Sequence, residues 1–136
     1  MKVKGLDHIG IAVHNLQDAL VFYRDTLGLQ LEGIEVIEEQ GVRAAALSVG
    51  GTHLELLEAT DREGPIARFL SSRGEGIHHI CLEVDDIEVA LSNLDTRGVR
   101  LIDRTPRIGA GGKKIAFLNP RSTFGVLIEL SEKARR

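Results

Sequence analysis

Two histidines and two glutamates recur at matching places in the two halves of the sequence. His8 and Glu55 are 47 positions apart in the first half, and His79 and Glu129 are 50 positions apart in the second. Two imidazoles and two carboxylates form a suitable ligand set for Zn, Co, Mn, Ni or Fe, with room left for water or a substrate. We therefore take these four residues as a candidate metal site.

The recurrence is part of an internal repeat. The stretch LDHIGIAVHNLQDAL, which begins at Leu6, aligns with IHHICLEVDDIEVAL, which begins at Ile77, at an offset of 71. HLELL in the first half matches LIELS in the second, and this match places Glu55 on Glu129. The two half-chains therefore share one plan. Because the candidate ligands recur in both halves, they support a metal site more strongly than a single inward-facing glutamate would.

The periodicity of apolar residues predicts the elements that must position these side chains. Alternating apolar residues indicate strands beginning near His8 and His79, and apolar residues at helical spacing predict a helix after each strand. Asn15 and Asp86 are the expected N-caps of these helices. Glycines at positions 28 and 98 are expected to end them.

Each half continues with three shorter predicted strands, at residues 30–38, 42–49, 52–59, 100–107, 113–118 and 125–131. A short helix that begins near Pro65 is expected between the halves. The plan is βαβββ twice. We therefore predict an α+β fold with a single domain over residues 1–136, made of two modules at about 5–60 and 76–131.

Side chains alternate between the two faces of a strand, and this alternation predicts which way the candidate ligands point. If Ile80 packs against the helix, His79 and Cys81 face the opposite side. His78 then faces away from His79, and we expect it to have a supporting or structural role. Glu55 and Glu129 lie opposite the aliphatic faces of their own strands in the same way.

Three other residues have side chains that can bind a metal ion. His53 shares a strand face with Glu55 and is an alternative ligand, although its repeat mate is Leu127. His14 stands beside a helix N-cap, where a solvated side chain is expected. Cys81 shares a face with His79, and burial as a small apolar side chain is its expected role.

Composition excludes several classes of function. The chain has 136 residues, of which 43% are hydrophobic and 27% charged, as is ordinary for a soluble globular domain. A net charge of -3 without a long basic run argues against nucleic-acid binding. No stretch approaches about 18 apolar residues and no signal peptide is evident, so no membrane association and a cytoplasmic location are expected.

Four segments, LDHIGIAV, GEGIHHICLEVDDI, GAGGKKIAFLNPRS and GVLIEL, resemble the vicinal oxygen chelate superfamily, and within it the methylmalonyl-CoA epimerase family. The resemblance covers nearly the whole chain. It implies two tandem βαβββ modules that form a cup-shaped half-barrel of the glyoxalase/bleomycin resistance/dioxygenase type. It further implies one divalent metal ion (Co, Zn, Mn or Ni), with ligands at the positions of His8, Glu55, His79 and Glu129.

The resemblance also implies a reaction, the interconversion of (2R)- and (2S)-methylmalonyl-CoA in propionyl-CoA metabolism. The C2 proton is abstracted and returned through a metal-stabilised enolate, and Glu129 is implied as one acid/base group. Some epimerases place the second catalytic glutamate just after an EQGV-like segment, where this chain has Ala44. We hypothesise that Glu55 acts on the opposite face instead, at a position where some related epimerases carry glutamine.

The acyl-CoA substrate requires donors for its anionic groups. Gly111, Gly112 and Lys113, in a glycine-rich loop, and Ser122, in NPRS, are the candidate substrate-binding residues. A hairpin turn would explain the glycine-rich loop equally well, and an ordinary turn would explain the NPRS segment. A homodimer is expected from the resemblance, because symmetric association is common.

Two alternatives stay open at the level of sequence. Glyoxalase I, an isomerase of a glutathione hemithioacetal, uses the same four ligand types. The second alternative is a metal-free binding member of the superfamily, in which the matching positions of the four polar residues would be a coincidence. Burying these four polar groups without partners would cost free energy of folding. An extradiol dioxygenase is less favoured, because Glu55 would crowd the open position of its iron site.

Overall fold

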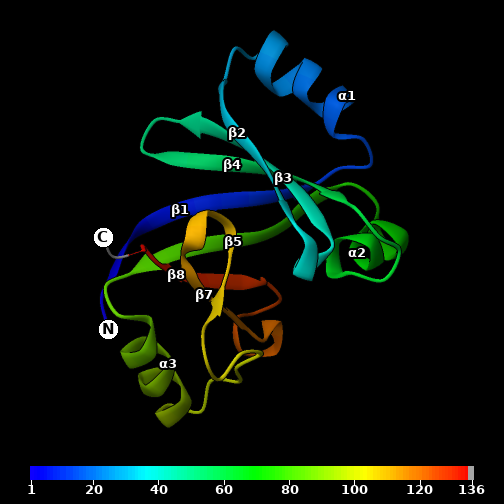
Figure 1. Ribbon diagram of the computed structural model, residues 1–136. Helices are drawn as coiled ribbons and strands as arrows, with labels where there is room; N and C mark the ends of the chain where they lie inside the picture. The colour runs from blue at the N-terminus through cyan, green and yellow to red at the C-terminus, as the bar shows by residue number, and fades with distance from the viewer. Residues whose placement is uncertain (135–136) are drawn as a thin grey trace. The chain divides into compact units, whose positions relative to one another are not determined.

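The computed structural model describes residues 1–134, which divide into two compact units (Figure 1). The first unit is His8–His78, and the second unit joins Met1–Asp7 to the chain from His79 onward. Strands β1 (Val3–Ala12) and β5 (Gly76–Val84) therefore contribute residues to both units. None of the described helices is long and apolar enough to cross a membrane.

The first unit has the strand order β2-β3-β4-β1. Its strands after β1 are β2 (Gln30–Ile37), β3 (Val42–Val49) and β4 (Thr52–Ala59). The pairs β2·β3 and β3·β4 are antiparallel, whereas β1 runs parallel to β4. The three later strands begin and end within one residue of their predicted bounds, because each is a self-contained alternating run between turn residues.

Helix α1 (Leu16–Leu20) follows β1 and continues as a π-helical turn over Val21–Thr26. The Asn15 side chain accepts a hydrogen bond from the Asp18 amide at 2.9 Å, which confirms the predicted N-cap. The core beneath this helix consists of Val13, Leu16, Leu20, Ala45, Leu47 and Leu56. The predicted linker helix is α2 (Pro65–Arg73), with Pro65 in its first turn.

The second unit repeats this plan with the strand order β5-β8-β7-β6. Its elements after β5 are α3 (Ile87–Thr96), β6 (Arg107–Ile108), β7 (Lys114–Leu118) and β8 (Ile128–Glu132). Asp86 caps α3 by accepting from the Val89 amide at 3.1 Å, as predicted. The core of this unit joins α3 to the strands through Val84, Ile87, Ala90, Leu91, Ala116, Leu118 and Leu130.

In both units, a glutamate carboxylate on a strand binds the backbone amide at the start of the helix that follows β1 or β5. Neither glutamate was predicted from the sequence to have this role. Oε2 of Glu58 on β4 accepts a hydrogen bond from the Leu16 amide at 2.8 Å in the first unit. Oε1 of Glu132 on β8 accepts one from the Ile87 amide at 2.9 Å in the second. Each glutamate therefore satisfies an amide at the start of a helix, which has no partner within the helix itself.

Two predicted strands of the second half were wrong in extent. The strand expected at 100–107 is reduced to an isolated bridge at Leu101 and the two-residue β6. The chain bends between them, because Oδ2 of Asp103 accepts from the Phe117 amide at 2.8 Å in place of a ladder partner. The last strand begins at Ile128 rather than at 125, since Gly125 lies in a turn with a φ of 89°.

Candidate metal centre

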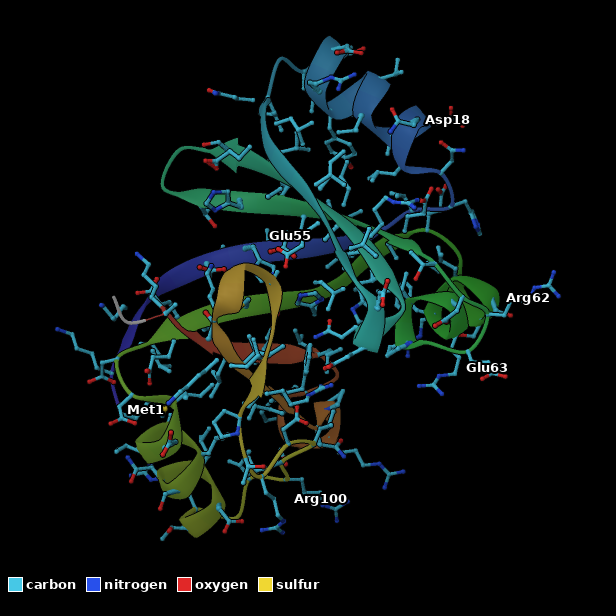
Figure 2. All side chains as sticks on the ribbon, viewed as in Figure 1. Met1, Asp18, Glu55, Arg62, Glu63 and Arg100 are labelled. Carbon is cyan, nitrogen blue, oxygen red and sulfur yellow. The ribbon has the colours of Figure 1, made fainter. Side chains whose placement is uncertain are left out.

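In the first unit, Nδ1 of His8 lies 3.2 Å from Oε2 of Glu55. The parallel pairing of β1 with β4 sets Gly10 opposite Glu55, so His8 and Glu55 project from the same face of neighbouring strands. The side chains of His8 and Glu55 are only 7% and 16% exposed. Figure 2 shows Glu55 within the strands, in contrast to the outward-pointing Arg62 and Glu63 near α2.

The second unit contains the same arrangement. Nε2 of His79 lies 3.0 Å from Oε1 of Glu129, and both side chains are buried. The parallel pairing of β5 with β8 sets Cys81 opposite Glu129, as Gly10 stands opposite Glu55. The predicted pairing of one histidine with one glutamate in each half is therefore present in the structure.

The geometry of each pair fits a shared divalent ion. Nitrogen and oxygen ligands bind Zn and similar ions at about 2.1 Å, so two ligand atoms on one ion stand about 3.0–3.4 Å apart for angles between a right angle and the tetrahedral value. The separations of 3.2 Å in the first unit and 3.0 Å in the second meet this condition. The chemistry of the donors and their burial therefore suit a metal ion.

The other histidines have different surroundings. Nε2 of His53 lies 2.6 Å from Oε2 of Glu32, and both side chains are substantially exposed. The ring of His78 stands edge-to-face against Phe69 of α2, with centroids 5.0 Å apart. The side chain of His14 is exposed. These contacts favour His8 and His79 over the other histidines as ligands.

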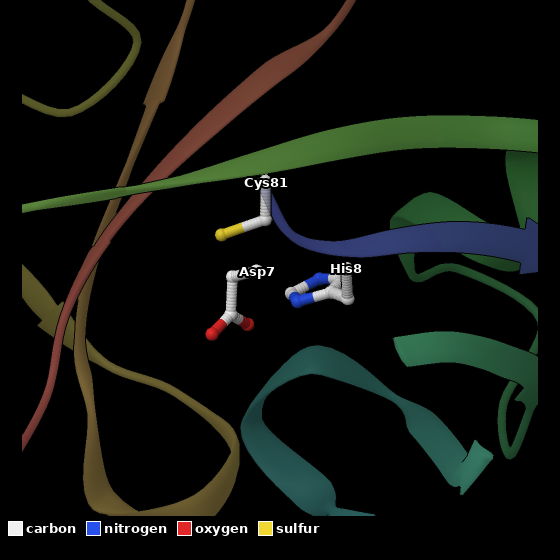
Figure 3. A group of neighbouring side chains, drawn as sticks. All are labelled: Asp7, His8 and Cys81. Carbon is white, nitrogen blue, oxygen red and sulfur yellow. The ribbon is translucent and has the colours of Figure 1, made fainter. Parts of the chain in front are cut away.

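Cys81 is fully buried, and its Sγ lies within 4.8 Å of a carboxylate oxygen of Asp7. Figure 3 shows both side chains, with His8 next to Asp7 along β1. Asp7 also binds Nζ of Lys113 through both carboxylate oxygens, at 2.9 and 3.1 Å. Lys113, a candidate substrate residue, is thus in an ion pair that ties the glycine-rich loop to the middle of β1.

The remaining candidate substrate residues lie in two turns. Gly111 and Gly112 have φ values of 69° and 75° in a short 3-10 turn, a backbone conformation that favours glycine. The hydroxyl of Ser122 accepts a hydrogen bond from the Arg100 amide at 2.8 Å, so it ties its turn to the segment that follows α3. The predicted roles of these residues in substrate binding stay predictions.

Position 44 is apolar and belongs to the core of the first unit. Ala44 is 5% exposed and packs with Ala12, Val42, Leu57 and Ile66. The residue directly across from it on β2 is Glu35, an exposed carboxylate. Glu55, by contrast, stands between Gly10 on β1 and Ala46 on β3, two residues with little or no side chain. The residues directly across from Glu55 on its two neighbouring strands are therefore small, and the β1 side chain that contacts its carboxylate is His8.

Arg107, which was not among the predicted site residues, lies near the second pair. Phe117 on β7 stands directly across from Glu129, and its ring lies edge-to-face with His79. The guanidinium of Arg107 lies over the same ring. Position 107 fell at the end of a predicted strand, where a charged residue is unremarkable, so no local signal could have identified it.

Comparison with known proteins places this geometry in a family. The profile of the Glyoxalase/Bleomycin resistance protein/Dioxygenase superfamily matches residues 7–117. The mitochondrial methylmalonyl-CoA epimerase of Dictyostelium discoideum is 43% identical over 129 residues, which are 94% of this chain and 78% of that protein.

Solved structures give the same result. The crystal structure of methylmalonyl-CoA epimerase from Mycobacterium tuberculosis has a TM-score of 0.94 and 40% identity, over 98% of this chain and 90% of that chain. A methylmalonyl-CoA epimerase in complex with methylmalonyl-CoA and NH4+ has a TM-score of 0.94 and 39% identity, over 98% and 96%. These likenesses confirm the predicted fold class and the predicted resemblance.

Proposed function

The chain belongs to the Glyoxalase/Bleomycin resistance protein/Dioxygenase superfamily, and we propose that it is an isomerase that interconverts (2R)- and (2S)-methylmalonyl-CoA with the aid of a divalent metal ion. The observation that carries the proposal is the repeated pair of a buried imidazole and a nearby carboxylate, His8 with Glu55 and His79 with Glu129. An acyl-CoA is the substrate class named for the relatives that share nearly the whole chain.

The C2 proton of the substrate lies between a thioester and a carboxylate, yet it is too weakly acidic for an unaided carboxylate base. A divalent ion held by the two histidines and two glutamates would supply a positive charge that offsets the negative charge developing as C2 loses its proton. Within each unit, the chain supplies a nitrogen and an oxygen ligand that already lie about one ligand–ligand distance apart.

Inversion at C2 requires a base on one face and an acid on the other. Glu129 takes one of these roles. Glu55 takes the second, because the first unit has Ala44 where some epimerases carry a carboxylate, and because Glu55 is the repeat mate of Glu129.

The glycine-rich loop at Gly111 and Gly112, together with Lys113 and Ser122, is the proposed contact region for the CoA thioester. The ion pair of Lys113 with Asp7 holds this loop in place. The metal identity among Co, Zn, Mn and Ni, the homodimer and the cytoplasmic location stay predictions from the sequence.

The test is to incubate the metal-loaded protein with (2S)-methylmalonyl-CoA in D2O and to follow C2 deuterium and the 2R epimer. Epimerisation with solvent deuterium in the product, abolished by a chelator, is the expected result. No turnover with metal demonstrably bound would contradict the proposal. Conversion of methylglyoxal with glutathione under the same conditions would then favour the glyoxalase I alternative.

A further inference from the structure

Arg107 on β6 is held in a defined position by two contacts within the second unit. Its Nε lies 3.0 Å from Oδ1 of Asp103, and one terminal nitrogen donates to Oδ2 of Asp103 at 3.2 Å. The guanidinium carbon lies 5.6 Å from the centroid of the Phe117 ring. An arginine stacked on an aromatic face and paired with a carboxylate loses much of its conformational freedom before any ligand arrives.

Phe117 connects this cation to the candidate metal centre. The ring centroids of Phe117 and His79 are 5.7 Å apart with planes at 80°, and Phe117 is the cross-strand neighbour of Glu129. The guanidinium of Arg107 and the imidazole of His79 therefore contact the same ring. A positive charge therefore stands one aromatic ring away from His79.

The guanidinium retains binding capacity. Arginine has five N–H groups in a planar fork, and Asp103 uses one edge of this fork. The Arg107 side chain is 47% exposed, whereas that of Asp103 is 14% exposed. Since the carboxylate anchor is sheltered and the cation is open, the remaining N–H groups are available to an anion from solution.

The other cations around the loop are committed to different partners. Lys113 is bound to Asp7 and Lys114 lies 3.0 Å from Glu88 on α3. Arg104, three residues before Arg107, is 77% exposed and lies 3.4 Å from Asp95 on α3. Arg107 thus differs from these neighbours in being fixed against a ring that touches a candidate metal ligand.

We infer that Arg107 binds the free carboxylate of the malonyl thioester and so selects acyl-CoAs that carry a second acid group; this inference rests on the proposed function. A planar guanidinium recognises a carboxylate through two parallel hydrogen bonds. The phosphates of CoA are separated from the thioester by the long pantetheine arm. A cation that shares a ring contact with His79 is therefore matched to the acyl end of the substrate rather than to the phosphates.

The test compares two thioesters that differ in the carboxylate. Binding of malonyl-CoA and of propionyl-CoA to the metal-loaded protein is measured by isothermal titration calorimetry for the wild type, Arg107→Gln, Arg107→Lys and the control Arg104→Gln. Arg107→Gln should weaken malonyl-CoA binding about 10- to 100-fold, the effect expected for a lost charge-assisted contact, and leave propionyl-CoA binding unchanged. Arg107→Lys should restore part of the loss, and Arg104→Gln should behave as the wild type.

Equal weakening of both ligands by Arg107→Gln would overturn the inference, because it would indicate a contact with CoA itself or a disturbed fold. Unchanged malonyl-CoA binding would overturn it as well. Unchanged propionyl-CoA binding and metal content show that the variant is folded. If the wild type epimerises and only the Arg107 effect is missing, this inference alone fails. If malonyl-CoA binding depends on Arg107 but the wild type does not epimerise, the proposed reaction fails and the carboxylate site stands.

Discussion

Nε2 of His79 on β5 lies 3.0 Å from Oε1 of Glu129 on β8, and the pair is buried. The separation results from the parallel register of the two strands, in which Glu129 stands opposite Cys81, two residues beyond His79. His8 and Glu55 repeat this relationship at 3.2 Å. A buried imidazole and carboxylate at such distances are suited to hold a cation between them.

Removal of the metal should abolish epimerisation and lower the melting temperature. A ligand present at about 100 times its dissociation constant stabilises the folded state by about 2.7 kcal/mol, so chelation should remove a stabilisation of this order. Scanning calorimetry with and without a chelator, together with elemental analysis, measures both effects. His79→Ala should lower the metal content, whereas the exposed His53→Ala should retain it. A metal content that depends on His53 and not on His79 would contradict the assignment.

Glu55→Gln should separate metal binding from proton transfer. The amide oxygen can still serve as a ligand, so the metal content should be retained, but the base is lost from one face of C2. In D2O, exchange of one epimer should slow by at least about 100-fold, while the other still exchanges without inversion. NMR of each pure epimer measures this. The control is Glu35→Gln, which removes the carboxylate across from Ala44. If that variant loses exchange and Glu55→Gln does not, Glu35 is the base.

Glu132→Ala should destabilise the second unit, because it leaves the Ile87 amide at the start of α3 without its carboxylate partner. A buried donor left unsatisfied costs about 1–3 kcal/mol. Urea unfolding followed by circular dichroism measures the free energy of unfolding. Glu88→Ala, at an exposed position on α3, is the matched control and should change this free energy by less than about 0.5 kcal/mol. Equal effects of the two variants would show that the contact with Ile87 is unimportant.

Acidification should break the hydrogen bond between Lys2, just before β1, and the carboxylate of Asp85, just after β5. The backbone amide of Lys2 donates to Oδ1 of Asp85 at 3.0 Å, and this bond lowers the pKa of Asp85 below its ordinary value of 3.8. The folded state favours the ionised carboxylate of Asp85. Its contribution to the stability of the fold is therefore present above pH 3.8 and is lost as the pH falls through the lowered pKa. An NMR titration of the Lys2 amide should therefore show a midpoint below 3.8, absent in Asp85→Asn. A midpoint at or above that value would argue against the bond.

Local patterns in the sequence were sufficient to predict most of the helices and strands. The strands after α1, and the N-caps Asn15 and Asp86, were predicted within one residue because alternation and capping depend on neighbours a few positions apart. The predicted strand at 100–107 failed at Asp103, whose carboxylate bonds to the Phe117 amide fourteen residues later. The helix anchors Glu58 and Glu132 went unnoticed for the same reason, since each bonds to an amide more than forty residues away.

The sequence by itself determined the βαβββ repeat and the candidate ligands His8, Glu55, His79 and Glu129, because a duplication preserves residue type and strand face at equivalent positions. Only the tertiary structure decided that each histidine lies about one ligand–ligand distance from its glutamate, since strand register sets that separation. It alone brought Arg107 onto the ring beside His79. Contacts between residues far apart in the chain leave no local pattern, and they appear only when the strands pair.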